Sequence, residues 1–156
     1  MENDKNTEMT VAKICNGTVI DRIPSDKLFR VIALLGLEES SSLITFGYNL
    51  DSKKIGKKAI IKIADRFLEP NEVNKVSLVA PNAKIAIIKN YEVAEKIQLE
   101  IPETIKGDFK CFNPKCITNN EPMQTYFRAI DKAKGMFKCH YCERVISAEE
   151  MTLKNK

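Results

Sequence analysis

Apolar and polar positions alternate every second residue in several stretches of the first hundred residues, a period that is typical of β-strands. Short polar turns such as Lys89-Asn90 separate these stretches, and Asn16-Gly17 interrupts the first of them. β-branched residues are frequent within them, as in strands generally. The pattern predicts five strands, at residues 11–23, 43–50, 56–64, 83–88 and 91–99.

Two other stretches carry apolar residues at helical spacing. The first starts after Ser25, a candidate N-cap, and ends at Gly36. The second starts at Pro70, a favoured first helical residue, and stops before Pro81. The stripes that define these helices are Leu28, Val31, Ile32 and Leu35 in the first, and Val73, Val76 and Val79 in the second.

The resulting order is β, α, β, β, α, β with one extra strand, which predicts an α+β fold with a ferredoxin-like first domain. We expect this domain at residues 9–100, preceded by a polar, disordered leader at residues 1–8. Proline and glycine bracket residues 101–107, which we interpret as a connector. Residues 108–156 then form a small β-rich second domain.

Four cysteines in two close pairs dominate the second domain. Cys111 and Cys116 form a C-x4-C hook, and Cys139 and Cys142 form a C-x2-C hook. Two such hooks can place four thiolates at the corners of a tetrahedron, the arrangement that a structural zinc ion prefers. A site closed by four thiolates leaves no position for a reacting water, so the metal is expected to stabilise structure.

Alternatives to this metal site involve the same few residues. The four cysteines could form two disulfides, although the chain shows no signal peptide and has a fifth cysteine, Cys15. Cys15 lies in an apolar run and fits a small core residue better than a ligand. His140, the single histidine, could replace a thiolate, or it could face solvent or a partner.

Composition and motifs argue against several classes of function. The 25 basic and 21 acidic side chains nearly balance, unlike those of a dedicated nucleic-acid binder. No apolar run approaches the roughly 20 residues of a membrane span, and no catalytic signature is present. We therefore expect a soluble, cytoplasmic protein that is not an enzyme. The rival is a zinc-ribbon adaptor that grips nucleic-acid phosphates with Lys106, Lys110, Lys115, Arg128, Lys132, Lys134 and Lys138.

Lysines on the predicted strands are candidates for binding a polyanion. Lys58 and Lys62 are four residues apart and share one strand face, where both could contact a nucleoside triphosphate. Lys96 could join them if its strand pairs nearby, and Asp21 could accept hydrogen bonds from ribose hydroxyls. The alternative is that Lys58 and Lys62 are the solvent face of an edge strand and Asp21 is an ordinary surface charge.

Several motifs occur together in one order. They are Gly17-Thr18-Val19-Ile20-Asp21-Arg22-Ile23-Pro24, Lys58 with Ile61-Lys62-Ile63, Ala80-Pro81, Asn90-Tyr91-Glu92-Val93, and the C-x4-C and C-x2-C-E hooks. In this combination the chain resembles the regulatory chain of aspartate carbamoyltransferase, from about Val11 to Val145.

The resemblance implies a non-catalytic subunit that controls pyrimidine biosynthesis, binding CTP and ATP, with UTP as a further candidate effector. It implies one structural zinc ion per chain, a homodimer through the N-terminal domains, and docking on the catalytic chain through the zinc domain. Asp21 and Lys96 match ribose-binding positions, and Asn113 and Glu143 match positions that face the catalytic chain. The whole matching nucleotide site is Ile14, Val19, Asp21, Lys58, Lys62, Ile88, Tyr91, Val93 and Lys96.

Three residues depart from the family pattern. Arg22 stands where the family has a histidine, and Ala86 and Lys115 stand where it has asparagines. The extra charge of Arg22 is expected to strengthen the binding of a triphosphate.

Overall fold

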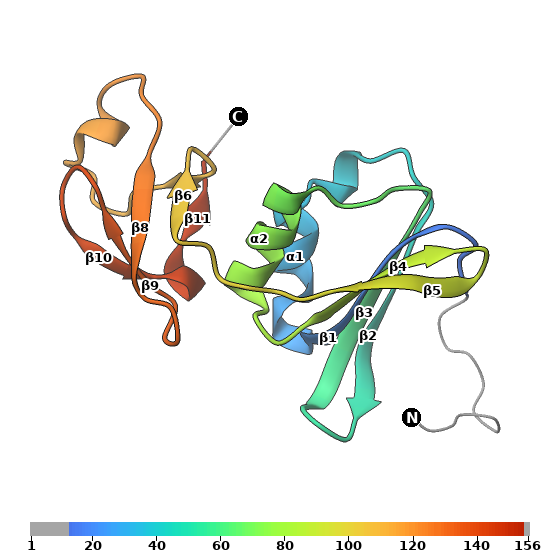
Figure 1. Cartoon of the computed structure of the whole chain (residues 1–156). Coiled ribbons are helices and arrows are strands. Elements are labelled where there is room, and N and C mark those ends of the chain that lie inside the picture. Colours follow the sequence, from blue (N-terminus) through green and yellow to red (C-terminus); the bar gives the residue numbers. More distant parts are fainter. Residues whose placement is uncertain (1–12, 155–156) are drawn as a thin grey trace.

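The apolar faces predicted from the sequence meet in an antiparallel sheet with two helices on one side (Figure 1). This computed structural model describes residues 13–154, so the predicted leader and Val11 lie outside the described residues. The sheet order β2-β3-β1-β4-β5 is that of a ferredoxin-like fold with one added edge strand, which confirms the predicted fold. The elements are β1 (Gly17–Pro24), α1 (Leu28–Leu34), β2 (Ile44–Ser52), β3 (Gly56–Ala64), α2 (Pro70–Val79), β4 (Lys84–Lys89) and β5 (Glu92–Ile97).

The first helix begins differently from the prediction. Ser25 does not cap α1, because it is the first residue of a 3-10 turn, η1 (Ser25–Lys27), that runs directly into the helix. Its hydroxyl instead accepts a hydrogen bond from the backbone N–H of Asn49 at 3.2 Å. Gly36 adopts φ 63° just beyond the helix, so a residue without a Cβ ends α1 as predicted.

The second helix begins as the sequence predicts. Pro70 occupies its first turn, and Glu69 and Glu72 form a reciprocal capping box that satisfies two free backbone N–H groups. The apolar stripe then packs its side chains into the core beneath the sheet. Its predicted members, Val73, Val76 and Val79, are all buried.

A bulge in β1 decides which side chains face the core. Ile20 and Ile23 are three residues apart, so in a regular strand they would lie on opposite faces. Both are nevertheless fully buried, because Asp21 and Arg22 together occupy the place opposite Ile60 on β3. The bulge thereby leaves the acid and the arginine outside the core while it restores the apolar face.

The C-terminal unit contains two small sheets around three buried phenylalanines, Phe109, Phe127 and Phe137. Residues 101–107 are not connector throughout, since residues 104–106 form a strand that pairs with β8. Sequence periodicity cannot show a strand of three residues. The strands are β6 (Thr104–Lys106), β7 (Phe109–Lys110), β8 (Tyr126–Asp131), β9 (Met136–Cys139), β10 (Val145–Ser147) and β11 (Thr152–Leu153), and the remaining 3-10 turns are η2 (Leu37–Glu39), η3 (Ile117–Asn119) and η4 (Ala148–Glu150).

The two helices lie between the large sheet and the C-terminal unit (Figure 1). On that side, Lys75 of α2 forms an ion pair with Asp108 at 3.4 Å.

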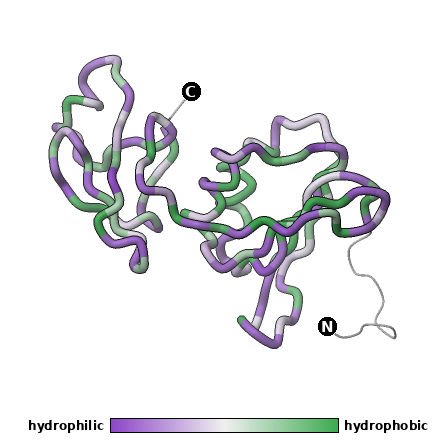
Figure 2. The backbone as a smooth tube through the Cα atoms, in the orientation of Figure 1, coloured by the Kyte–Doolittle hydropathy of each residue, from purple (hydrophilic) through white to green (hydrophobic). Residues whose placement is uncertain are grey.

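Hydrophobic and hydrophilic positions alternate along the backbone of both units (Figure 2). Within the described residues, no helix is long and apolar enough to cross a membrane.

Candidate metal centre and nucleotide pocket

Two tight turns present the four cysteines of the C-terminal unit. In the first hook the backbone N–H of Cys116 donates to the carbonyl of Asn113 at 2.9 Å. The side chain of Asn119 closes this hook by donating to the carbonyls of Cys111 and Asn113 at 2.9 and 2.7 Å. In the second hook the backbone N–H of Glu143 donates to the carbonyl of Cys139 at 2.9 Å. Backbone hydrogen bonds thus hold each pair of thiols in place.

The sulfur atoms form a cluster with the dimensions of a tetrahedral metal site. One ligand atom from each of Cys111, Cys116, Cys139 and Cys142 lies within 4.8 Å of the others. The Sγ atoms of Cys111 and Cys142 are 3.7 Å apart, and those of Cys116 and Cys139 are 3.8 Å apart. A tetrahedron with zinc–sulfur bonds of about 2.3 Å has edges of about 3.8 Å. The cluster can therefore hold a metal ion and is consistent with structural zinc.

Burial changes the acidity of these thiols. It raises the pKa of Cys111 and of Cys139, because a buried thiolate loses the solvation of water. Burial also acts to raise the pKa of Cys142, but hydrogen bonds from the Asn113 side chain, the Arg144 backbone and two neighbouring thiols lower it to about 7. A metal must displace the protons of Cys111 and Cys139, which is the usual coupling of metal binding to deprotonation.

The alternatives to an all-cysteine site do not match the geometry. The paired sulfur atoms are much farther apart than the roughly 2.05 Å of a disulfide bond. His140 is exposed and packs between Tyr126 and Tyr141, outside the cluster. Cys15 lies in the other unit, outside the cluster, as predicted for a residue that is not a ligand. It is partly exposed, so the prediction that it is a core residue is wrong. Its carbonyl accepts a hydrogen bond from the backbone N–H of Tyr91.

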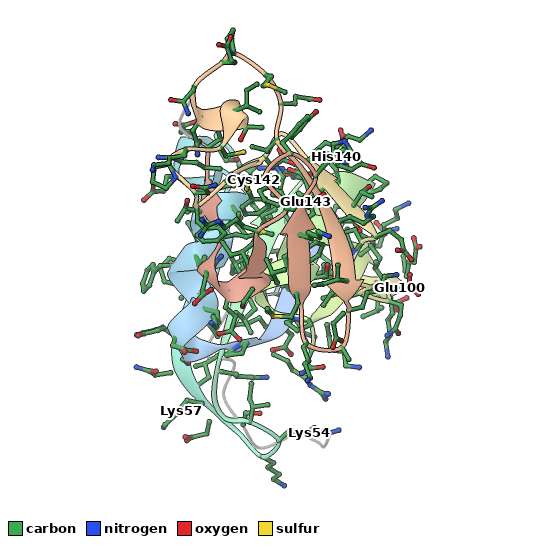
Figure 3. The ribbon with its side chains drawn as sticks, turned by 90° about the vertical axis from the view of Figure 1, so that its left-hand side faces the viewer. Lys54, Lys57, Glu100, His140, Cys142 and Glu143 are labelled. Carbon is green, nitrogen blue, oxygen red and sulfur yellow. The ribbon has the colours of Figure 1, made fainter. Side chains whose placement is uncertain are left out.

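The two residues predicted to face a catalytic chain lie beside the hooks. The Asn113 side chain accepts a hydrogen bond from the backbone N–H of Lys115 at 3.1 Å, which fixes its orientation. Glu143 is exposed and adopts φ 64° in the second hook. Figure 3 shows Cys142 and Glu143 close together and well apart from Lys54 and Lys57 of the β2–β3 hairpin. The docking role of Asn113 and Glu143 stays a prediction.

A second candidate site is a pocket of about 580 Å³ on the sheet. It lies on the face away from the helices, because its strand residues alternate with the buried core positions. Its volume falls within the usual range for small-molecule sites. Its lining comes from β1, β3, β4 and β5 and the residue after β5, and comprises Val19, Asp21, Arg22, Ile60, Lys62, Lys84, Ile85, Ala86, Ile88, Val93, Lys96, Ile97 and Gln98.

Six of the nine residues predicted for a nucleotide line this pocket: Val19, Asp21, Lys62, Ile88, Val93 and Lys96. A bulge in β5, where Val93 pairs with Ile88 and Glu95 with Ile87, explains how Val93 and Lys96 share a face. Ile14, Lys58 and Tyr91 are not part of the lining, although Lys58 forms an ion pair with Asp21 at 3.0 Å. Their roles in binding stay predictions.

Sequence reasoning missed several lining residues. Lys84 and Gln98 bring polar groups, and Ile60 and Ile97 bring apolar surface. Lys84 stands directly opposite Asp21 in the β1–β4 pairing. The β1–β4 pairing would have identified Lys84 as a pocket residue. It follows only from the order of the strands in the sheet, which periodicity alone does not supply.

The charged groups of the pocket are unevenly solvated. Lys62 is only 8% exposed. Burial lowers the pKa of Lys62, and Lys13 adds to this while the carboxylate of Asp21 counteracts it. The Asp21 carboxylate also accepts a hydrogen bond from the backbone N–H of Arg22 at 2.7 Å. An anionic ligand would offset the cost of keeping Lys62 charged where little water reaches it.

Comparison with known proteins agrees with the two units of this chain. Residues 9–100 match the family model of the aspartate carbamoyltransferase regulatory chain, allosteric domain. Residues 103–152 match that of the aspartate carbamoyltransferase regulatory chain, metal binding domain. The match thus extends over both candidate sites.

Near-full-length relatives carry the same description, aspartate carbamoyltransferase regulatory chain. The protein of Phocaeicola vulgatus is 58% identical over 151 residues, which cover 97% of this chain and 97% of that protein. The protein of Bacteroides fragilis is 56% identical over 93% of this chain and 95% of its own length. That of Pyrococcus horikoshii is 47% identical over 92% of this chain and 96% of its own. With both units matched, the chain belongs to the family of aspartate carbamoyltransferase regulatory chains, as a regulatory and not a catalytic subunit.

Proposed function

We propose that this chain binds CTP- and ATP-type nucleotides in the sheet pocket and transmits their effect to catalytic chains through its metal-binding domain. The observation that carries the proposal is the make-up of the pocket. Apolar side chains from Val19, Ile60, Ile88 and Val93 lie beside four cations and one carboxylate, Asp21. A nucleotide has matching parts, namely a flat base, a ribose with hydroxyls and a chain of phosphates.

The parts of the nucleotide are assigned by chemistry. The base packs against Val19, Ile88 and Val93, which offer apolar surface on three adjacent strands. Asp21 accepts hydrogen bonds from the ribose hydroxyls, and its ion pair with Lys58 holds the carboxylate in place. Lys96 lines the same pocket as Asp21, and we assign it to both the ribose and the phosphates.

The phosphates are assigned to the remaining cations. Lys62 contributes a positive charge from β3. Arg22 and Lys84, which are not among the nine residues that the resemblance implied, add two more. Arginine can bind phosphate oxygens with two parallel hydrogen bonds, whereas lysine acts as a point charge. Ala86 carries no polar side-chain atom, so it makes room in the pocket and leaves recognition of the base to other groups.

The metal-binding domain is proposed to dock on the catalytic chain. Zinc bound by four thiolates would fix the two hooks, and the hooks present Asn113 and Glu143 to the partner. Around them, large apolar side chains are exposed to solvent: Phe112, Ile117, Tyr141 and Val145. Exposed apolar groups beside polar ones are typical of protein interfaces. Because free thiolates persist in reducing compartments, we also propose a cytoplasmic location.

Two copies of the chain are proposed to pair through their N-terminal domains. Strand β2 is an outer strand of the large sheet, so one of its edges can pair with another chain. Phe46 and Tyr48 of β2 contact Phe29 of α1, with ring centroids 6.1 and 5.5 Å apart. All three rings are exposed, between 46% and 58%. A second copy would cover this aromatic surface.

Calorimetry with CTP and ATP on the metal-loaded full chain tests nucleotide binding. Lys96→Ala should weaken binding by about tenfold or more, since a hydrogen bond to a charged group contributes about 1.5–3 kcal/mol. Lys57→Ala, at the exposed hairpin tip, is the matched control and should bind as the wild type does. Absence of heat with either nucleotide, or equal affinity of the wild type and Lys96→Ala, would contradict the assignment.

A further inference from the structure

Arg30 on α1 connects the two domains. Its Nη2 donates to the carbonyl of Ala148 at 2.9 Å and to that of Met151 at 2.6 Å. Its Nη1 donates to the carbonyl of Glu149. One guanidinium therefore binds three backbone carbonyls in and just after η4. We refer to Arg30 with these three carbonyls as the interdomain clamp.

The clamp suits arginine because the carbonyls at the end of a short helical turn have few donors within that turn. The carbonyl of Ala148 accepts the backbone N–H of Met151 at 3.3 Å, and a carbonyl oxygen can accept a second hydrogen bond. Arginine offers five N–H donors in a fixed planar fork, so it can serve several acceptors at once. The guanidinium is partly buried, and this burial lowers the pKa of Arg30 although the carboxylate of Glu149 acts to raise it. One helical turn earlier, Lys27 lies 3.5 Å from a carboxylate oxygen of Glu149.

On one side, the clamp is attached closely to the nucleotide pocket. The bulge at Asp21 and Arg22 leads through Ile23 and Pro24 into η1, and η1 runs without a loop into α1. Ile23 and Leu28 are fully buried within this stretch. Because this stretch is short and held by these two buried side chains, a shift of the bulge on ligand binding would also move Arg30.

On the other side, the clamp is attached to the metal hooks. Strand β10 leads directly into η4 and pairs with β9, which ends at Cys139. The backbone N–H of Cys139 donates to the carbonyl of Arg144, and that of Ala148 donates to the carbonyl of Gly135. Movement of the three carbonyls is thereby passed to the sheet that carries the metal ligands.

We propose that Arg30 is a positioning residue that fixes the metal-binding domain on α1 and carries the effect of a bound nucleotide to the metal hooks. This inference rests on the proposed function, because it presumes a nucleotide in the sheet pocket. It adds a residue that belongs neither to the pocket lining nor to the cysteine cluster. Its physical basis is a rigid path with the clamp at the junction of the two domains.

Hydrogen exchange of the metal-loaded full chain, with and without saturating CTP, tests the clamp. In the wild type, CTP should change exchange at residues 145–153 by about fivefold or more, the lower end of usual coupling energies. In Arg30→Ala this change should be lost. Because coupling between two sites is reciprocal, CTP affinity should change by no more than about the same fivefold factor, and the metal content should be unchanged.

Two further variants separate the clamp from general stability. Glu149→Ala removes the carboxylate that faces Lys27 but keeps the carbonyl that Arg30 binds, so it should retain the CTP effect. Arg30→Lys keeps the charge but loses the fork, so it should retain only part of the effect. It also provides the decisive comparison if Arg30→Ala fails to fold.

The outcomes distinguish this inference from the proposed function. If the wild type gives no heat with CTP, the proposed function itself fails. If CTP binds but exchange at residues 145–153 does not change, or changes equally in the wild type, Arg30→Ala and Arg30→Lys, the clamp is overturned and nucleotide binding stands.

Discussion

The two domains of this chain achieve stability in different ways. The N-terminal domain buries branched aliphatic side chains such as Ile20, Ile61 and Ile63 between a five-stranded sheet and two helices. The C-terminal domain spans about fifty residues and relies on three phenylalanines and four cysteines. A unit of that size buries too little apolar surface to be stable without help. The comparison suggests that one domain folds by itself while the other depends on its metal.

The same difference separates the tasks of the two domains. In the N-terminal domain the helices cover one face of the sheet and leave the other face open for a pocket. In the C-terminal domain the four cysteines form one cluster, and large apolar side chains stay at the surface. The proposed nucleotide pocket and the proposed docking surface therefore lie on opposite sides of the helical layer, which carries the interdomain clamp.

Metal removal should produce the largest effect. Structural zinc contributes apparent free energy on the order of 10 kcal/mol, so a chelator or Cys139→Ser should unfold residues 104–153. The N-terminal sheet should remain folded, because its core contains none of the ligands. Zinc content measured together with residue-resolved hydrogen exchange checks this.

Cys15→Ser is the matched control, since Cys15 lies outside the cluster. It should keep the full metal content. Retention of the folded C-terminal domain after complete loss of metal would remove the proposed difference between the two domains.

A core substitution should affect the other domain alone. Ile61 is fully buried, and Ile61→Ala should destabilise the N-terminal domain by about 2–5 kcal/mol, from lost burial and the cavity left behind. Metal content should be unchanged. Denaturant unfolding followed separately in each domain measures the effect, and an equal loss of stability in both would show that they unfold as one unit.

Nucleotide binding should depend on the protonation of Lys62. Because burial lowers the pKa of this lysine from its ordinary value of 10.5, it loses its charge at a lower pH than an exposed lysine. Affinity for CTP should therefore fall as the pH rises through this lowered pKa, by up to about tenfold for the loss of one charged contact. Calorimetry between neutral and alkaline pH measures the fall.

Lys62→Arg keeps a positive charge over the whole pH range, so its CTP affinity should be nearly independent of pH. A parallel fall in the wild type and in this variant would assign the pH dependence to another group.

The smallest effect is expected at the tip of the β2–β3 hairpin. Lys57 and Asp51 form an ion pair at 2.6 Å, but their side chains are 59% and 93% exposed. Water and salt screen such pairs. Lys57→Ala should leave the thermal midpoint of both domains unchanged, and a clear shift would indicate that the hairpin contributes to folding.

The strands, helices and cysteine hooks could be predicted because each has a local pattern. Val73, Val76 and Val79 mark α2 by spacing alone, and the two cysteine pairs predict a cluster without knowledge of the fold. The bulge at Asp21 and Arg22 has no such pattern, since it depends on the partner strand. The same holds for Lys84, which joins the pocket only because β4 lies beside β1.

Short strands and turns could not be predicted from the sequence either. Residues 104–106 form a strand because β8 offers it hydrogen bonds, and three residues cannot show a period. Ser25 fits the pattern of a cap, but tertiary contact with Asn49 occupies its hydroxyl. Arg30 resembles any polar residue on an exposed helix face until the C-terminal domain is placed against it.

The most direct test of the account combines this chain with the catalytic chain of aspartate carbamoyltransferase and measures aspartate saturation with and without CTP. The account predicts that CTP shifts the saturation curve of the metal-loaded assembly, and that Arg30→Ala weakens this shift while CTP still binds. An unchanged curve in an intact assembly, with CTP shown by calorimetry to be bound, would contradict it.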